Sequence, residues 1–168
     1  MRLWREHWKL GVVLLLLVLC QFTLRPAIGD ARLERVAPDF LLLALLVYAI
    51  QARPGQGAMA GFVVGLATDS LSMAAFGAGA LAHTVVGYLA TWGKAVFFAD
   101  NLFINAVFFF VGTWVRDIMV LLVAQHAGGT VLWWQLGYLA PLRALTTAVA
   151  GVLTLLVFRR WLNIRVSE

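Results

Sequence analysis

Long apolar runs fill most of this sequence, and short polar or glycine-containing stretches separate them. A helix needs roughly 20 apolar residues to cross the hydrocarbon core of a bilayer. The runs approach this length, so the pattern predicts an all-α integral membrane protein with a bundle of about six transmembrane helices. We place the spans at about residues 9–24, 38–52, 58–71, 78–98, 102–124 and 140–158. No loop is long enough to form a second domain, so we expect residues 1–168 to form one transmembrane domain.

The start of the second span carries two helix-start signals, Pro38 and Asp39. Proline suits the first helical turn because the N–H group that it lacks would have no partner there. An aspartate at this position complements the positive end of the helix dipole. The span is short, so we expect its helix to be tilted, extended into the preceding polar stretch or set in thinned lipid.

The composition excludes a soluble fold. Hydrophobic residues make up 62% of the chain and charged residues 12%, and the mean hydropathy is +0.90. A soluble domain of this size cannot bury so many apolar side chains, because much of its surface must face water. The basic N-terminal segment and the apolar run after it resemble a signal peptide. No small-x-small cleavage site follows them, so we expect an uncleaved first helix.

The net charge of +5 reflects membrane topology rather than nucleic-acid binding, because the cations cluster at the ends of apolar runs. With six spans, both termini lie on one side of the membrane. That side carries eight cations: Arg2, Arg5, Lys9, Arg53, Lys94, Arg159, Arg160 and Arg165. The other side carries three: Arg25, Arg32 and Arg35. The positive-inside rule therefore places both termini in the cytoplasm.

Asp69 lies at the end of a stripe of glycines in the third span. Gly57, Gly61, Gly65 and Asp69 are four residues apart and share one helix face. Glycines at this spacing let another backbone approach closely, so the stripe predicts a packed face. The carboxylate caps the next helix, pairs with an arginine or forms a binding site, and the sequence leaves these alternatives open.

Three further charges fall inside predicted spans: Arg116, Asp117 and Arg143. A charge at the centre of a span costs roughly 2.5–3.5 kcal/mol on insertion scales. The fifth and sixth spans are consecutive and therefore antiparallel neighbours, so we expect Arg143, Asp117 and Asp69 to form a charged cluster towards the outer leaflet. The cluster consists of structural ion pairs or surrounds a polar cavity for a ligand.

The sequence contains none of the common catalytic or nucleotide-binding motifs, and we expect no enzymatic activity, cofactor or metal. His83 stands alone within the fourth span. A zinc site needs three or four converging ligands, so a hydrogen-bonded packing role is favoured for this histidine.

Two segments resemble the MreD family of bacterial rod shape-determining proteins. The first is the P-D-F-L-L-L-A-L-L-V-Y segment at 38–48, and the second is G-F-V-V-G-L-A-T-D-S-L at 61–71, which continues to Gly77 and Leu81. The family-motif positions in this sequence are Pro38, Asp39, Gly61, Gly65, Asp69 and Gly77.

The resemblance implies a subunit of the elongasome in the bacterial inner membrane. Such proteins bind the bitopic protein MreC and work with MreB filaments, RodA and a class B penicillin-binding protein in lateral peptidoglycan synthesis. In fold, the family resembles the S components of energy-coupling-factor transporters. We therefore expect a non-enzymatic scaffold that contacts MreC and membrane lipid but no nucleic acid. The alternative is an S-component-like protein that binds a small molecule or a lipid precursor.

Overall fold

The computed structural model describes residues 2–49, 51–71, 76–97, 102–124 and 133–162, which contain helices and no strand. The longer helices are α1 (Arg2–Ala27), α4 (Pro54–Leu71), α5 (Ala78–Phe97), α6 (Leu102–Ala124) and α8 (Ala140–Leu162). Two short helices, α2 (Ala31–Val36) and α3 (Phe40–Ala49), lie between α1 and α4, and a π-helical turn, η1 (Gln135–Leu139), precedes α8. Each predicted span thus contains a helix.

The helix boundaries differ from the prediction mainly around the second span. The polar stretch before it contains α2, which the apolar pattern did not predict. Helix α3 is shorter than the predicted 38–52, because it begins only at Phe40. Pro38 therefore precedes the helix instead of occupying its first turn, since Asp39 takes the capping position. Parts of the prediction lie outside the described residues: the break at 72–75, residue 98, Arg165 and the side chains of Arg2, Arg5, Arg25, Arg32, Lys94, Arg159 and Arg160.

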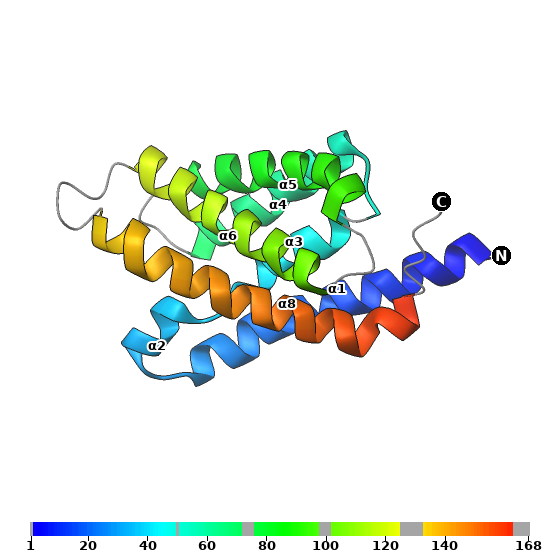
Figure 1. Cartoon of the computed structure of the whole chain (residues 1–168), viewed down its shortest axis with the longest axis horizontal. Coiled ribbons are helices and arrows are strands. Elements are labelled where there is room, and N and C mark those ends of the chain that lie inside the picture. The colour runs from blue at the N-terminus through cyan, green and yellow to red at the C-terminus, as the bar shows by residue number, and fades with distance from the viewer. Residues whose placement is uncertain (1, 50, 72–75, 98–101, 125–132, 163–168) are drawn as a thin grey trace.

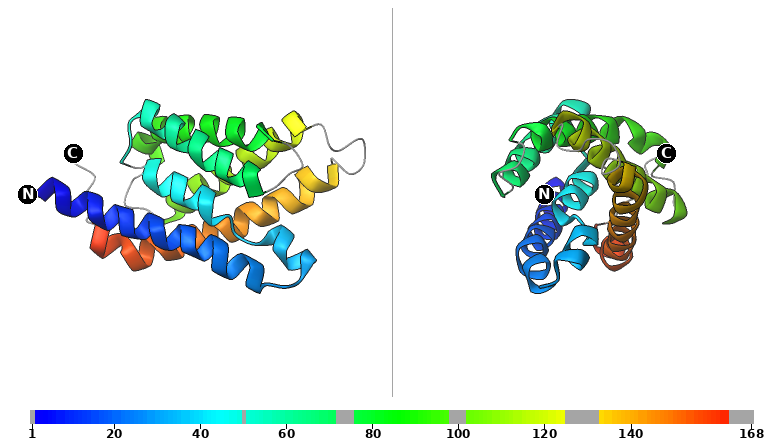
Figure 2. Two further views of the ribbon diagram at one scale, coloured as in Figure 1. Left: turned by 180° about the vertical axis from the view of Figure 1, so that it is seen from behind. Right: turned by 90° about the vertical axis from the view of Figure 1, so that its left-hand side faces the viewer.

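Helix α3 lies at the centre of the bundle. Eight of its ten residues are buried, as expected for a helix that is apolar on every side. It contacts α1, α4, α5, α6 and α8, and the end-on view in Figure 2 shows these helices around it. Its leucines form the core together with Phe109 of α6. At 1.5 Å per residue, a helix of ten residues is about 15 Å long, roughly half the thickness of the hydrocarbon core.

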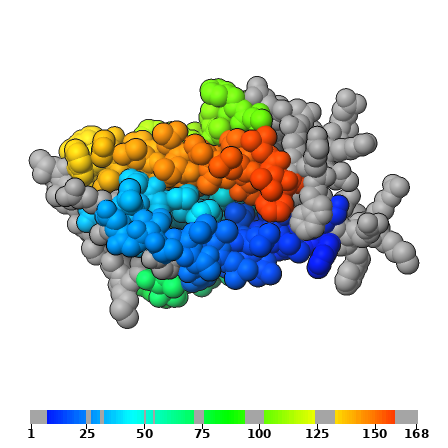
Figure 3. Space-filling view, turned by 90° about the horizontal axis from the view of Figure 1, so that it is seen from below, coloured from blue at the N-terminus to red at the C-terminus, as the bar shows by residue number. Residues whose placement is uncertain are grey.

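The surrounding helices form two groups. The antiparallel pair α4 and α5 packs on one side of α3, and α6 connects this pair to α8. Helices α1 and α8 run side by side along another face (Figure 3). The beginning of α1 and the end of α8 lie at one end of the molecule, whereas α2 and the beginning of α8 lie at the opposite end (Figure 1).

Within the described residues, two helices are long and apolar enough to cross a membrane. They cover Leu102–Val123, with a mean hydropathy of 2.0, and Gln135–Phe158, with a mean hydropathy of 1.7. Trp8–Leu24 is a shorter apolar helix. Helix α4 is less apolar because four of its residues are glycines, and most of these pack against α5.

Candidate functional site

The beginning of α3 is a polar centre inside the bundle. The first N–H groups of a helix have no partner within the helix, so they need side-chain acceptors when they are buried. Asp39 provides one, because its Oδ1 accepts a hydrogen bond from the Leu42 N–H at 3.0 Å, as an N-cap residue does. The Phe40 N–H donates to Gln21 Oε1 of α1 (3.1 Å), and the Asp39 N–H donates to Thr147 Oγ1 of α8 (3.1 Å).

Asp39 also belongs to a chain of ion pairs that we call the buried charge cluster: Asp39, Arg116, Asp117 and Arg143. Arg116 of α6 pairs with the second Asp39 oxygen, and its Nη1 lies 3.0 Å from Asp117 Oδ1. Arg143 Nη1 of α8 lies 3.5 Å from the same Asp117 oxygen. The Arg116, Asp39 and Asp117 side chains are all less than a tenth exposed. Opposite charges therefore alternate along the cluster, which reduces the cost of burying each one.

The cluster differs from the prediction in two respects. The structure brings Arg143 and Asp117 together, as expected, but Asp39 stands where Asp69 was predicted, and Arg116 joins the cluster as a fourth member. The sequence indicated Asp39 as a helix-start and family-motif residue and did not indicate its pairing with Arg116. The apolar run that follows Asp39 indicates such a partner, because an aspartate at the start of a helix that is buried on all sides needs a cation.

Asp69 lies at the end of α4 and caps the beginning of α5. Its Oδ2 accepts hydrogen bonds from the Gly77 N–H (2.9 Å) and the Ala80 N–H (2.9 Å), and its Oδ1 accepts one from the Gly79 N–H (3.0 Å). Gly77 has a φ of 100°, a conformation that residues with a side chain rarely adopt. The sequence left three roles open for Asp69, and in the structure it caps the next helix.

The glycine stripe of α4 lies directly against α5, which is the close packing that its spacing predicted. A Cβ atom at Gly57 would lie 2.5 Å from the Gly87 carbonyl oxygen, and one at Gly65 would lie 2.6 Å from the Gly79 carbonyl oxygen. A Cβ atom added at Gly61 would lie 2.7 Å from the His83 carbonyl carbon. The two backbones can approach this closely only where the side chain is absent. The α5 glycines that face this stripe, Gly79 and Gly87, are eight residues apart, which is a weaker local signal than the four-residue spacing in α4.

His83 lies in this helix pair and is almost fully buried. Its Nδ1 donates a hydrogen bond to the Gly79 carbonyl oxygen at 2.8 Å, and its Nε2 finds no hydrogen-bond partner among the residues that the structure describes. In the part of the chain that the structure describes, no three His, Cys, Asp or Glu side chains are close enough to hold a metal ion.

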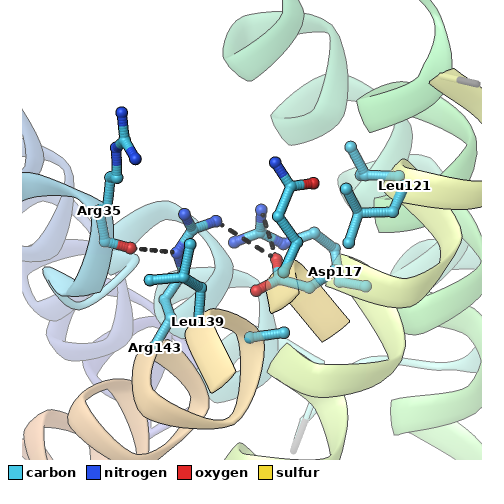
Figure 4. Close-up of a pocket in the computed structure, with 9 residues that line it drawn as sticks. Arg35, Asp117, Leu121, Leu139 and Arg143 are labelled. Atoms are coloured by element: carbon cyan, nitrogen blue, oxygen red, sulfur yellow. Dashed lines mark hydrogen bonds and ion pairs between the residues drawn. The ribbon is translucent and has the colours of Figure 1, made fainter. Parts of the chain in front are cut away.

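A cavity of about 420 Å³ opens beside the buried charge cluster, and we call it the arginine cavity. Its polar lining residues are Arg35, Arg116, Asp117, Gln135 and Arg143, and its apolar ones are Val120, Leu121, Leu139 and Ala140. Figure 4 shows Arg143 between the Arg35 carbonyl oxygen and Asp117. The Arg143 Nε–H donates to that carbonyl at 3.0 Å, and Thr146 Oγ1 donates to the Val36 carbonyl at 2.7 Å. These bonds attach the end of α2 to α8.

A comparison with protein families identifies the chain. The sequence model of the family described as rod shape-determining protein MreD matches residues 7–162, which is nearly the whole sequence. No curated protein and no solved structure gives a significant match. The family consists of structural membrane proteins with a role in cell shape, and the match confirms the resemblance predicted from residues 38–48 and 61–71. The chain therefore belongs to the MreD family of rod shape-determining proteins.

Proposed function

We propose that this protein is a non-enzymatic, multi-pass subunit of the bacterial elongasome that binds MreC in the cytoplasmic membrane. The family match over residues 7–162 is the observation that carries the proposal. Through MreC, the protein supports the work of MreB, RodA and a class B penicillin-binding protein in lateral peptidoglycan synthesis. In this role it contributes surfaces for assembly and no chemistry of its own.

The apolar exterior supports a location in the membrane. Large hydrophobic side chains are exposed on all the longer helices, for example Leu15 of α1, Val63 of α4, Leu81 of α5, Phe103 of α6 and Val157 of α8. Contact of such side chains with water is unfavourable, whereas lipid chains are as apolar as the side chains themselves. A short helix with a polar beginning, such as α3, is tolerated at membrane depth when surrounding protein satisfies its backbone.

The cation count supports cytoplasmic termini, and a reporter fusion tests this orientation. A reporter at residue 168 that is active only in the cytoplasm should give a signal, and one that is active only in the periplasm should give none. The opposite pattern would contradict the orientation without affecting the family membership.

We place the contact with MreC in the groove between α5 and α6. This α5–α6 groove has a volume of about 150 Å³, and the lining residues within the described part of the chain are apolar or glycine: Leu46, Val86, Leu89, Ala90, Gly93, Phe108, Val111, Gly112 and Val115. Small residues such as Ala90, Gly93 and Gly112 allow a further helix to approach closely. The groove suits the single transmembrane helix of a bitopic partner.

Copurification tests the proposal against its alternative. The tagged chain, extracted from native membranes in mild detergent, should retain MreC. An S component would instead retain two ATPases and a coupling subunit, together with a small molecule detectable by mass spectrometry. The arginine cavity is the observation that favours this second function. Recovery of the transporter subunits without MreC would overturn the scaffold proposal.

A further inference from the structure

We propose that the arginine cavity binds a phosphate group. None of the contacts proposed with MreC involves this cavity, which lies between α2, α6, η1 and α8 and not between α5 and α6. Its lining residues include three arginines and four apolar residues.

The charges at the cavity favour an anion. Three arginines line it, and the ion pairs found among the described residues join them to two carboxylates, Asp117 in the lining and Asp39, which does not line the cavity. One positive charge therefore remains in excess. Asp117 does not repel an anion strongly, because its Oδ1 already lies against both Arg116 and Arg143. The neighbouring acid Glu34 is exposed and does not line the cavity.

Arg35 is the lining cation whose guanidinium group extends away from the buried charge cluster and stays accessible to an anion (Figure 4). Its side chain is exposed and does not turn towards Asp117 (Figure 4). Among the described residues, no ion pair of Arg35 is found. A guanidinium group presents paired N–H donors whose geometry matches the oxygens of a phosphate.

Arg116 offers a further donor. Its side chain is more than nine-tenths buried, and its Nε–H has no hydrogen-bond partner within the described part of the chain. A buried donor without a partner destabilises a fold, and an acceptor in the cavity would satisfy it. Gln135 lines the same cavity, and its buried amide oxygen has no partner among the described residues, so the occupant carries a donor such as a hydroxyl or ammonium group beside its phosphate.

The surroundings of the cavity fit the depth of lipid headgroups, provided that the membrane location proposed above holds. Trp133 and Trp134 are 75% and 60% exposed, and Tyr138 is 52% exposed. The rings of Trp134 and Tyr138 stack at 4.7 Å, beside the lining residues Gln135 and Leu139. Exposed tryptophan and tyrosine mark the membrane interface, and at this depth a guanidinium group can pair with a lipid phosphate.

Binding to the purified chain tests the inference without MreC, so its failure and that of the scaffold proposal are distinguishable. Native mass spectrometry would compare phosphatidylglycerol with diacylglycerol of the same acyl chains, and calorimetry would measure inorganic phosphate. We expect phosphatidylglycerol to bind at least tenfold more tightly than diacylglycerol. Binding of inorganic phosphate alone would support the same site with a soluble ligand as its source.

The variant Arg35→Gln removes the exposed cation, and Arg53→Gln removes another exposed arginine, which does not line the cavity. We expect Arg35→Gln to weaken phosphate binding about tenfold and Arg53→Gln to leave it unchanged. The inference would be overturned if neither phosphate compound bound to the wild-type chain. It would also be overturned if Arg35→Gln bound as tightly as the wild type.

Discussion

Arg116 of α6 forms a buried ion pair with Asp39, the residue that caps α3 and stands 77 positions earlier in the chain. The pair links the central helix α3 to the surrounding helix α6. Because Asp39 uses one oxygen for the α3 backbone and the other for the arginine, a single side chain fixes both the start of α3 and its position against α6.

Asp39→Asn separates these two roles. Asparagine caps helices about as well as aspartate, but it removes one of the two carboxylates that pair with Arg116, so the buried charge cluster keeps an uncompensated positive charge. Removing one partner of a buried pair costs about 3–5 kcal/mol, so we expect a loss of this size in the free energy of unfolding. Denaturation of the purified chain in mixed micelles would measure it. The control is the double variant Asp39→Asn with Arg116→Met, which should recover part of the loss because no charge remains unpaired. Equal stability of Asp39→Asn and the wild type would contradict the role of the pair.

Asp69→Ala should destabilise the α4–α5 pair, because it removes the acceptor of three backbone N–H groups at the beginning of α5. Loss of an N-cap costs about 0.5–2 kcal/mol, and the charged, multiple bonds here favour the upper end. The unfolding free energy in mixed micelles is again the measurement. Ser70→Ala is the matched control, since the Ser70 hydroxyl is exposed and bonds only to its own helix. A smaller effect of Asp69→Ala than of Ser70→Ala would argue against the cap.

Gly61→Ala should separate α4 from α5. The added methyl group would lie 2.7 Å from the His83 carbonyl carbon and 3.0 Å from Thr84 Cα, so the two backbones must move apart. Overpacking of this kind costs about 1–3 kcal/mol, measured as a lower thermal midpoint. Gly11→Ala is the control, because nothing lies within 4 Å of its added atom and alanine favours a helix by roughly 0.5–1 kcal/mol over glycine. If both substitutions raised the midpoint, the close packing would be disproved.

Filling the α5–α6 groove should weaken MreC binding. Val111 lines this groove and is 42% exposed, so Val111→Trp can place its indole ring there without entering the core. We expect at least a tenfold loss of copurified MreC and rounded cells in a strain that depends on this protein. Val149→Trp on the exposed face of α8 is the control, at a similar exposure of 53%. Normal MreC recovery with Val111→Trp would place the contact elsewhere.

The sequence predicted the helices well because apolar runs and glycine breaks are local signals. The packed face of Gly57, Gly61 and Gly65 could also be predicted, since a spacing of four is a property of one helix. The partner of Asp39 could not, because the pairing depends on how α3 and α6 cross. Asp69 shows the same limit. The sequence included capping among the possible roles of Asp69, but whether Asp69 lies near the buried charge cluster depends on how α4 packs relative to α6 and α8.

The enclosed position of α3 also determines when its environment becomes complete during synthesis. The hydroxyl that receives the Asp39 N–H belongs to Thr147, and the bonds that hold the end of α2 come from Arg143 and Thr146. All three residues lie in α8, which the ribosome makes after every other helix described. A nascent chain that stops before α8 therefore keeps the Asp39 cap on α3 but leaves the Asp39 N–H without its acceptor, so the polar centre is complete only once α8 has been made.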